Sequence, residues 1–179
     1  SATEVAEQYQ SYSKNANVAA STLLTAYSTK VVASDQDDET AYMQIFNNTE
    51  DINVMYELQT RVGQKALSLS DDGVIINEKL AENLNKNVGD TITVESIDGM
   101  DAEVKISGIC EMYVRHYVFM TKSYYQSVFG TTPASNTMAV KLQGTDAEKQ
   151  ALQEEFASQE NISSVEFFGT LQDNFNQMI

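Results

Sequence analysis

Several residue types are nearly absent from this 179-residue chain, and each shortage excludes a class of protein. One cysteine, Cys110, excludes an internal disulfide, and one histidine, His116, excludes a two-histidine metal site within one chain. No apolar run approaches the roughly 18 residues of a membrane span. The N-terminus lacks the basic and apolar regions of a signal peptide, so we expect the chain to be an excised part of any membrane-bound parent.

Motifs for phosphate chemistry and for common catalysis are also missing. The eight glycines are isolated and form neither a dinucleotide-binding nor a phosphate-binding loop, and no serine occupies a GxSxG elbow. The densest carboxylate cluster is Asp35, Asp37, Asp38 and Glu39, but Thr40 and Phe46 stand where a calcium loop needs glycine and glutamate. We expect this cluster to cap a helix. The sequence predicts no catalytic residue, no cofactor and no metal ion.

Basic residues are scarce, and the formal net charge is −15. Such a field repels nucleic-acid phosphates and anionic lipid headgroups, so we expect no nucleic-acid partner and no adsorption to a membrane surface. An acidic surface serves either solubility or a cationic partner, and the charge alone leaves both open.

The periodicity of apolar residues predicts an α+β domain. Spacings of three and four predict a helix over residues 2–28, and similar spacing at Ala41, Ile45 and Phe46 predicts a second helix. The other predicted elements are strands at 30–34, 52–62, 137–142 and 164–168, a helix at 146–159, and a last helical segment around Leu171, Phe175 and Met178.

This order of elements predicts a split βαβ sheet of ferredoxin-like style, with helices on one face. Residues 1–62 and 134–179 would form one discontinuous α/β subdomain, and residues 63–133 a smaller β-rich inserted subdomain. Asp98-Gly99 lies between two alternating segments and predicts a hairpin inside the insert.

The segment MYVRHYVFM reads as a strand with His116 on its apolar face. Cys110, six residues earlier, would lie about 20 Å away along an extended strand. A Cys–His pair within that strand is therefore excluded unless the chain bends, and we interpret both residues as structural. A cell-surface hydrolase would require one of them, so we expect no enzymatic activity.

Aromatic residues concentrate between positions 113 and 129, and most of them are expected in the core. Alternation would place some on an exposed face, where aromatic side chains favour a protein interface. The candidate partner interface consists of Tyr113, Arg115, Tyr117, Tyr124 and Tyr125.

Residues 73–130 carry a run of short motifs: GVII at Gly73, EKLA at Glu78, VGDTI at Val88, SGI at Ser107 and the YYQSVFG block that ends at Gly130. This run resembles a segment in the extracytoplasmic domains of FtsX-like and MacB-like ABC transporter permeases, especially the large permeases of Gram-positive anaerobes. Met112 departs from the resemblance, because asparagine is usual there.

The resemblance implies a porter-type α/β subdomain interrupted by a β-rich insert, on the extracytoplasmic side of the cell membrane. Its partners would be the transmembrane helices of the parent permease, a separate cytoplasmic ATPase subunit, and a peptide, a lipid or a partner protein. The implied function is to couple ATP hydrolysis to export or to mechanical signalling, with the chain ends near 1–28 and 169–179 as the transmission element. The alternative is an extracellular sensor module that binds a peptide or a partner.

Overall fold

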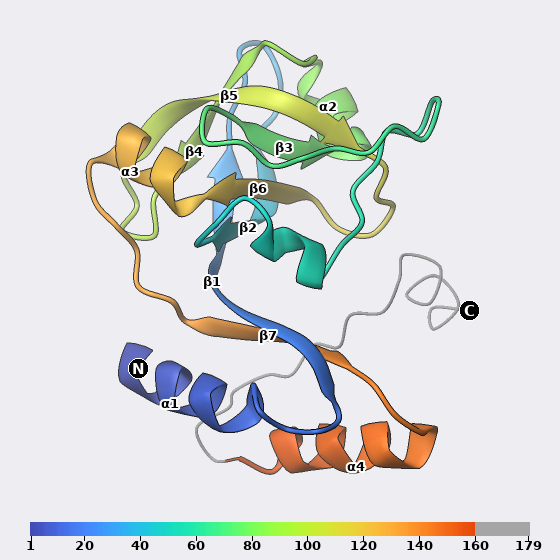
Figure 1. Ribbon diagram of the computed structural model, residues 1–179. Helices are drawn as coiled ribbons and strands as arrows, with labels where there is room; N and C mark the ends of the chain where they lie inside the picture. Colours follow the sequence, from blue (N-terminus) through green and yellow to red (C-terminus); the bar gives the residue numbers. More distant parts are fainter. Residues whose placement is uncertain (160–179) are drawn as a thin grey trace.

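The computed structural model describes residues 1–159 of the chain. These residues form a mixed seven-stranded sheet in the order β4-β5-β3-β6-β2-β1-β7, together with four α-helices and one short 3-10 helix (Figure 1). The α+β class is thereby confirmed. The predicted elements at 164–168 and around Leu171 to Met178 lie outside the described residues, as does the predicted transmission segment at 169–179.

The elements have the following bounds. The helices are α1 Ala2–Tyr12, α2 Glu78–Leu84, α3 Lys122–Phe129 and α4 Asp146–Ala157, and the 3-10 helix η1 is Asp51–Val54. The strands are β1 Val18–Val31, β2 Glu39–Phe46, β3 Val74–Asn77, β4 Thr91–Glu95, β5 Asp101–Cys110, β6 Tyr117–Thr121 and β7 Thr137–Leu142.

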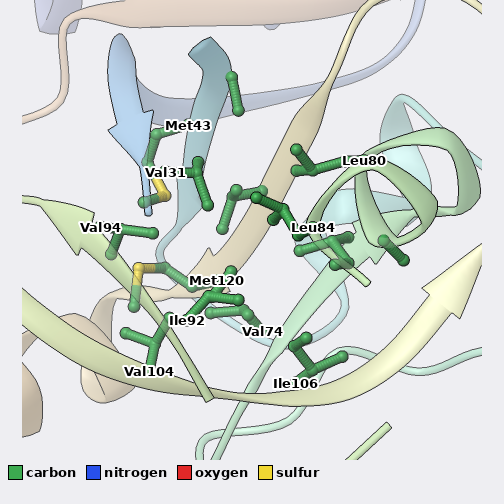
Figure 2. Close-up of a cluster of buried hydrophobic side chains, with 14 of the residues drawn as sticks. Val31, Met43, Val74, Leu80, Leu84, Ile92, Val94, Val104, Ile106 and Met120 are labelled. Atoms are coloured by element: carbon green, nitrogen blue, oxygen red, sulfur yellow. The ribbon is translucent and has the colours of Figure 1, made fainter. Parts of the chain in front are cut away.

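The sheet curls on itself, because its first and sixth strands meet. Val32, which follows β1, and Thr93 of β4 exchange both backbone hydrogen bonds at 2.9 Å. The interior of this barrel-like unit is apolar, with side chains from six strands and from α2 pointing at one another (Figure 2). Burying such side chains contributes roughly 1.5–3 kcal/mol each, so this interior is a large source of stability.

A second layer lies at the other end of the molecule. There α1, β7 and α4 surround the first half of β1 (Figure 1). A small separate core of Tyr12, Val18, Val140, Leu152 and Phe156 holds this layer together. The α4 helix begins with a capping box of Thr145 and Glu148, which confirms the helix predicted after the strand at 137–142.

Two of the predicted helices are wrong. Only residues 2–12 of the first are helical, and residues 18–31 form strand β1. The apolar residues Ala19, Leu23 and Tyr27 recur every four positions, a spacing that also keeps them on one face of a strand. Ala41 and Ile45 are also four positions apart, which suits a helix and a strand alike, and they lie in strand β2. The aspartate cluster before β2 therefore caps no helix.

Two of the predicted strands are also wrong. Residues 51–54 form η1, and the segment after it is irregular except for the bridge between Gln59 and Ala66. The strand expected through MYVRHYVFM is interrupted, since β5 ends at Cys110 and β6 begins at Tyr117. The expected Asp98-Gly99 hairpin is confirmed between β4 and β5, where Gly99 has a φ of +84°.

The division into two subdomains stays a prediction. Strand β6, inside the predicted insert, pairs in parallel with β2 from the first segment, so one continuous sheet crosses the predicted boundary.

Candidate functional site

The predicted aromatic interface is not a single surface. Tyr117 is 7% exposed and stacks on Phe119 with ring centroids 5.4 Å apart, while Tyr125 is fully buried against Phe129. Tyr124 is half-buried, and its hydroxyl oxygen accepts a hydrogen bond from the backbone of Lys105 at 2.9 Å. These three tyrosines pack inside the fold, and only Tyr113 and Arg115 of the five are exposed.

Asn77 explains why alternation failed in this region, and sequence reasoning missed it. Its fully buried amide donates to the backbone oxygen of Arg115 at 3.0 Å and accepts from the backbone N–H of Tyr117 at 2.8 Å. These bonds hold residues 112–117 in a loop in which Arg115 has a φ of +63°. A polar residue ending the apolar run GVIIN was the available signal, because buried amides need partners.

Tyr113 lies beside a second loop, residues 59–66. The backbone N–H of Glu111 donates to the oxygen of Gln59 at 2.9 Å, which joins the two loops. The Tyr113 hydroxyl donates to the Glu111 carboxylate, and this bond raises the pKa of Tyr113. Arg61 pairs with Glu78 at 2.7 Å, and both interact electrostatically with Tyr113.

An open groove of about 420 Å³ runs next to these loops. It is lined by residues 60–62, by residues of α2 and of the turn after it, and by Ile109. Its charged side chains, Arg61, Glu78, Glu82 and Lys86, balance one another. The groove therefore has no net charge in a chain of −15.

His116 and Cys110 do not form a catalytic pair. The imidazole Nε2 lies 3.6 Å from the carboxylate of Glu39, and Nδ1 is buried without a hydrogen-bond partner among the described residues. Cys110 is fully buried at the end of β5, and burial raises the pKa of its thiol to about 12. A nucleophile needs accessible thiolate, so the geometry offers no thiol chemistry here. Within residues 1–159 no group of three or more metal-ligating side chains comes together.

The junction between barrel and second layer is built on β1. Leu24 belongs to both parts, since it pairs with Phe46 of β2 on one side and with Thr137 of β7 on the other. The side chain of Asn136 extends this contact by bonding both backbone groups of Ala26 at 2.8 Å. We call the residues Leu24, Thr25, Ala26 and Asn136 the β1 junction.

The second layer brings the two ends of the described chain together. Tyr12 of α1 packs on Phe156 of α4 with ring centroids 4.3 Å apart, and its hydroxyl donates to Glu155 at 3.3 Å. The pKa of the Tyr12 hydroxyl is raised, chiefly by burial and further by the neighbouring Glu155 carboxylate. None of the helices in residues 1–159 combines the length and the hydropathy that a membrane crossing requires.

Comparisons with known proteins agree with this architecture. No curated protein matches the chain. Among solved structures, it is similar to the extracellular domain of the noncanonic ABC-type transporter YknZ from Gram-positive bacteria, at 15% identity and a TM-score of 0.55, over 87% of this chain and 85% of that one. It is also similar to the periplasmic region of MacB from Actinobacillus actinomycetemcomitans, at 14% identity and a TM-score of 0.50, over 97% and 81%.

At 15% and 14% identity the two structures show the fold alone. The family is shown by a model built for a whole protein family. The family model described as "MacB-like periplasmic core domain" matches residues 2–157, from the start of α1 to the end of α4. It includes the GVII-to-FG segment on which the resemblance rested. The chain therefore belongs to the MacB-like periplasmic core domain family, the extracytoplasmic domain of ABC transporter permeases.

Proposed function

We propose that this domain transmits movement from the membrane part of its parent permease, coupling cytoplasmic ATP hydrolysis to export or to mechanical signalling. The observation that supports this most directly is the continuity of β1. One 14-residue strand pairs with β7 in the layer that holds α1 and α4, and then with β2 in the barrel. A displacement of α1 is therefore carried into the barrel by backbone hydrogen bonds.

The position of α1 and α4, the first and last helices of the described residues, agrees with that role. Both α1 and α4 belong to the layer opposite the barrel, at the bottom of Figure 1. In a parent permease this layer would face the transmembrane helices. The barrel would stand away from the membrane, on the extracytoplasmic side.

Location is tested first, in the source cells. An antibody against the domain should detect a membrane-bound protein far larger than 19.8 kDa, and protease added outside intact cells should cleave it. A soluble band near that mass would contradict the proposal, because transmission requires a tethered domain.

Transmission is tested on the parent permease reconstituted with its ATPase in nanodiscs. A donor dye at exposed Asp98, on the β4–β5 hairpin, reports its distance to acceptor-labelled lipids. We expect ATP trapping to change this distance, while the distance between Glu7 and Asp98 stays constant. The matched control carries an ATPase subunit that cannot bind ATP, and with it the distance should stay unchanged. If the distance from Asp98 to the lipids does not change on ATP trapping, the domain does not transmit movement. This result would leave the conclusion about its location at the membrane unchanged.

A further inference from the structure

The second half of β5 has a neighbouring strand on one side only. Strand β3 pairs with it on that side, while β4, on the other side, pairs only with the first half of β5. Two further bonds continue the β4 pairing, from the Gly89 N–H to the Ile106 oxygen at 2.8 Å and from the Ile106 N–H to the Asp90 oxygen at 2.9 Å. From there to Glu111, whose N–H donates to the oxygen of Gln59, the described residues place no backbone partner on this edge of β5.

The backbone groups of Ile109 face this gap. Successive residues of a strand direct their backbone groups to opposite sides, so Ile109 shares the side of Glu111, whose N–H bonds to Gln59 and not to β3. Gly108 and Cys110, which alternate with Ile109, are buried, whereas Ile109 is only half-buried. Among the described residues, neither the N–H nor the carbonyl of Ile109 has a backbone partner on that side. One donor and one acceptor therefore stand ready for an incoming chain.

The open groove beside α2 lies along this gap. Its lining includes Ile109, Lys86, which is close in sequence to Gly89 at one end of the gap, and residues 60–62, which follow Gln59 at the other end. The groove volume of about 420 Å³ lies within the range of about 300–1,000 Å³ that is typical of ligand sites. The gap spans roughly 16 Å at about 3.3 Å per residue, so an added strand has room for about four residues.

The charges around the groove favour a carboxylate at one of its ends. Arg61 and Glu78 neutralise each other at 2.7 Å, and Glu82 lies 3.9 Å from Lys79, which is outside the groove. Lys86 has no ion-pair partner among the described residues. It lies at the end of the gap where β4 pairs with β5, so a peptide whose C-terminal carboxylate reached Lys86 would run antiparallel to β5. Antiparallel pairing is slightly more stable per residue than parallel pairing.

We propose that the groove binds a short free peptide, which adds to β5 as an extra strand. One peptide residue exchanges both backbone hydrogen bonds with Ile109, and the C-terminal carboxylate pairs with Lys86. An apolar side chain of the peptide packs on Ile109 and Ala81, which both line the groove. Because the pairing within the chain closes the gap at both ends, the groove suits a peptide of about four residues better than a longer protein segment. The site does not depend on the transmission role, since α2 lies far from α1 and α4 (Figure 1).

NMR titration of the 179-residue chain tests binding. The probe is a mixture of acetylated tetrapeptides of valine, isoleucine and threonine with a free C-terminal carboxylate, because β-branched residues favour an extended backbone. We expect the amide signal of Ile109 to shift and its hydrogen exchange to slow, and the same mixture with amidated C-termini to bind at least tenfold more weakly. No change at Ile109, or changes centred on another part of the chain, would overturn the proposal.

The role of Lys86 is tested by substitution. Lys86→Gln should weaken binding of the carboxylate peptides at least tenfold and make the free and amidated peptides bind equally. Lys79→Gln is the matched control, since Lys79 is exposed on α2 outside the groove and should change nothing. Equal effects of the two substitutions would contradict a carboxylate at Lys86.

Methylation of the peptide amides tests the added strand. In an extended peptide only alternate amides face β5, so methylation of one amide at a time should give strong and weak losses of affinity in alternation. Equal losses at neighbouring amides would rule out pairing with Ile109. The same four residues at the C-terminus of a carrier protein should bind at least tenfold more weakly, because the bond between Glu111 and Gln59 closes that end of the gap. Equal binding would assign the groove to a protein terminus and overturn the free-peptide proposal.

Discussion

Asn136 binds Ala26 as a neighbouring strand would. Its side-chain oxygen accepts the Ala26 backbone N–H at 2.8 Å, and its side-chain nitrogen donates to the Ala26 backbone oxygen at 2.8 Å. One amide thus continues the β1–β7 pairing past Thr137, at the point where β1 passes into the barrel. The connection between layer and barrel therefore depends on a side chain as well as on backbone pairing.

The first prediction concerns this amide. Asn136→Ala leaves both backbone groups of Ala26 without the side-chain partner, at a cost of about 1–3 kcal/mol in the free energy of unfolding. Urea unfolding measures the change, and Asn53→Ala, at an exposed asparagine of η1, is the control. Hydrogen exchange should accelerate at Ala26 and leave the barrel interior protected. Equal losses of unfolding free energy in the two variants would show that the Asn136 side chain does not stabilise the connection between the layer and the barrel.

The second prediction concerns Asn77, which organises the loop before β6. Asn77→Leu has a similar volume but leaves the Tyr117 N–H and the Arg115 oxygen unpaired in a buried site, so we expect a loss of roughly 2–4 kcal/mol. The measurement is chemical denaturation, combined with hydrogen exchange of residues 112–117. Asn85→Gly is a suitable comparison, because Asn85 has a φ of +52° at an exposed helix end and glycine tolerates that conformation. Unchanged exchange in the loop would contradict the assigned role.

The sequence was sufficient where one signal was unambiguous. The Asp98-Gly99 turn predicted the hairpin between β4 and β5, the apolar spacing over 146–159 predicted α4, and both elements are present. It was insufficient where residues recur every four positions, since that spacing suits a helix face and a strand face alike. The β1 segment, rich in serine and threonine, becomes a strand because β2 and β7 flank it, and single-chain periodicity does not contain that information.

The candidate site was still less predictable. Alternation placed Tyr117 on an outer face, but the loop fixed by Asn77 changes the register before β6, and Tyr117 is buried. The predicted strand at 52–62 includes only the first part of the hairpin of residues 59–66, and it does not predict the exposure of Val62. The first miss comes from contacts between residues distant in sequence, because Asn77 binds Arg115 and Tyr117. The second comes from a local turn, closed by the bond from the Thr60 N–H to the Lys65 oxygen.

The third prediction uses the buried thiol. Burial raises the pKa of Cys110 from 9.0 to about 12, so the folded state excludes the thiolate. At about pH 8 a thiol reagent should react with the unfolded chain and not with the folded chain. The buried neutral thiol makes its full contribution to the free energy of unfolding at pH values below the thiol pKa of the unfolded chain. This contribution is lost as the pH rises through the thiol pKa of the folded protein.

The free energy of unfolding should therefore fall between pH 9 and 12, and fall less steeply in Cys110→Ala. The comparison with this variant is needed because burial also raises the pKa of Tyr27, which adds a slope of the same sign. Rapid labelling of the folded protein, or identical slopes for the two proteins, would contradict a buried neutral thiol.

The fourth prediction explains the glycine that begins the family segment. A Cβ on Gly73 would lie 2.6 Å from the Cβ of Ser107 and 3.1 Å from the backbone oxygen of Lys105, so β3 and β5 could not approach as they do. Gly73→Ala should cost about 1–3 kcal/mol through overpacking. The double variant Gly73→Ala/Ser107→Gly removes one of the two obstacles and should recover part of the loss. Denaturation of the four proteins completes a double-mutant cycle. A coupling energy near zero would show that the close approach of these two residues is not what requires glycine at position 73.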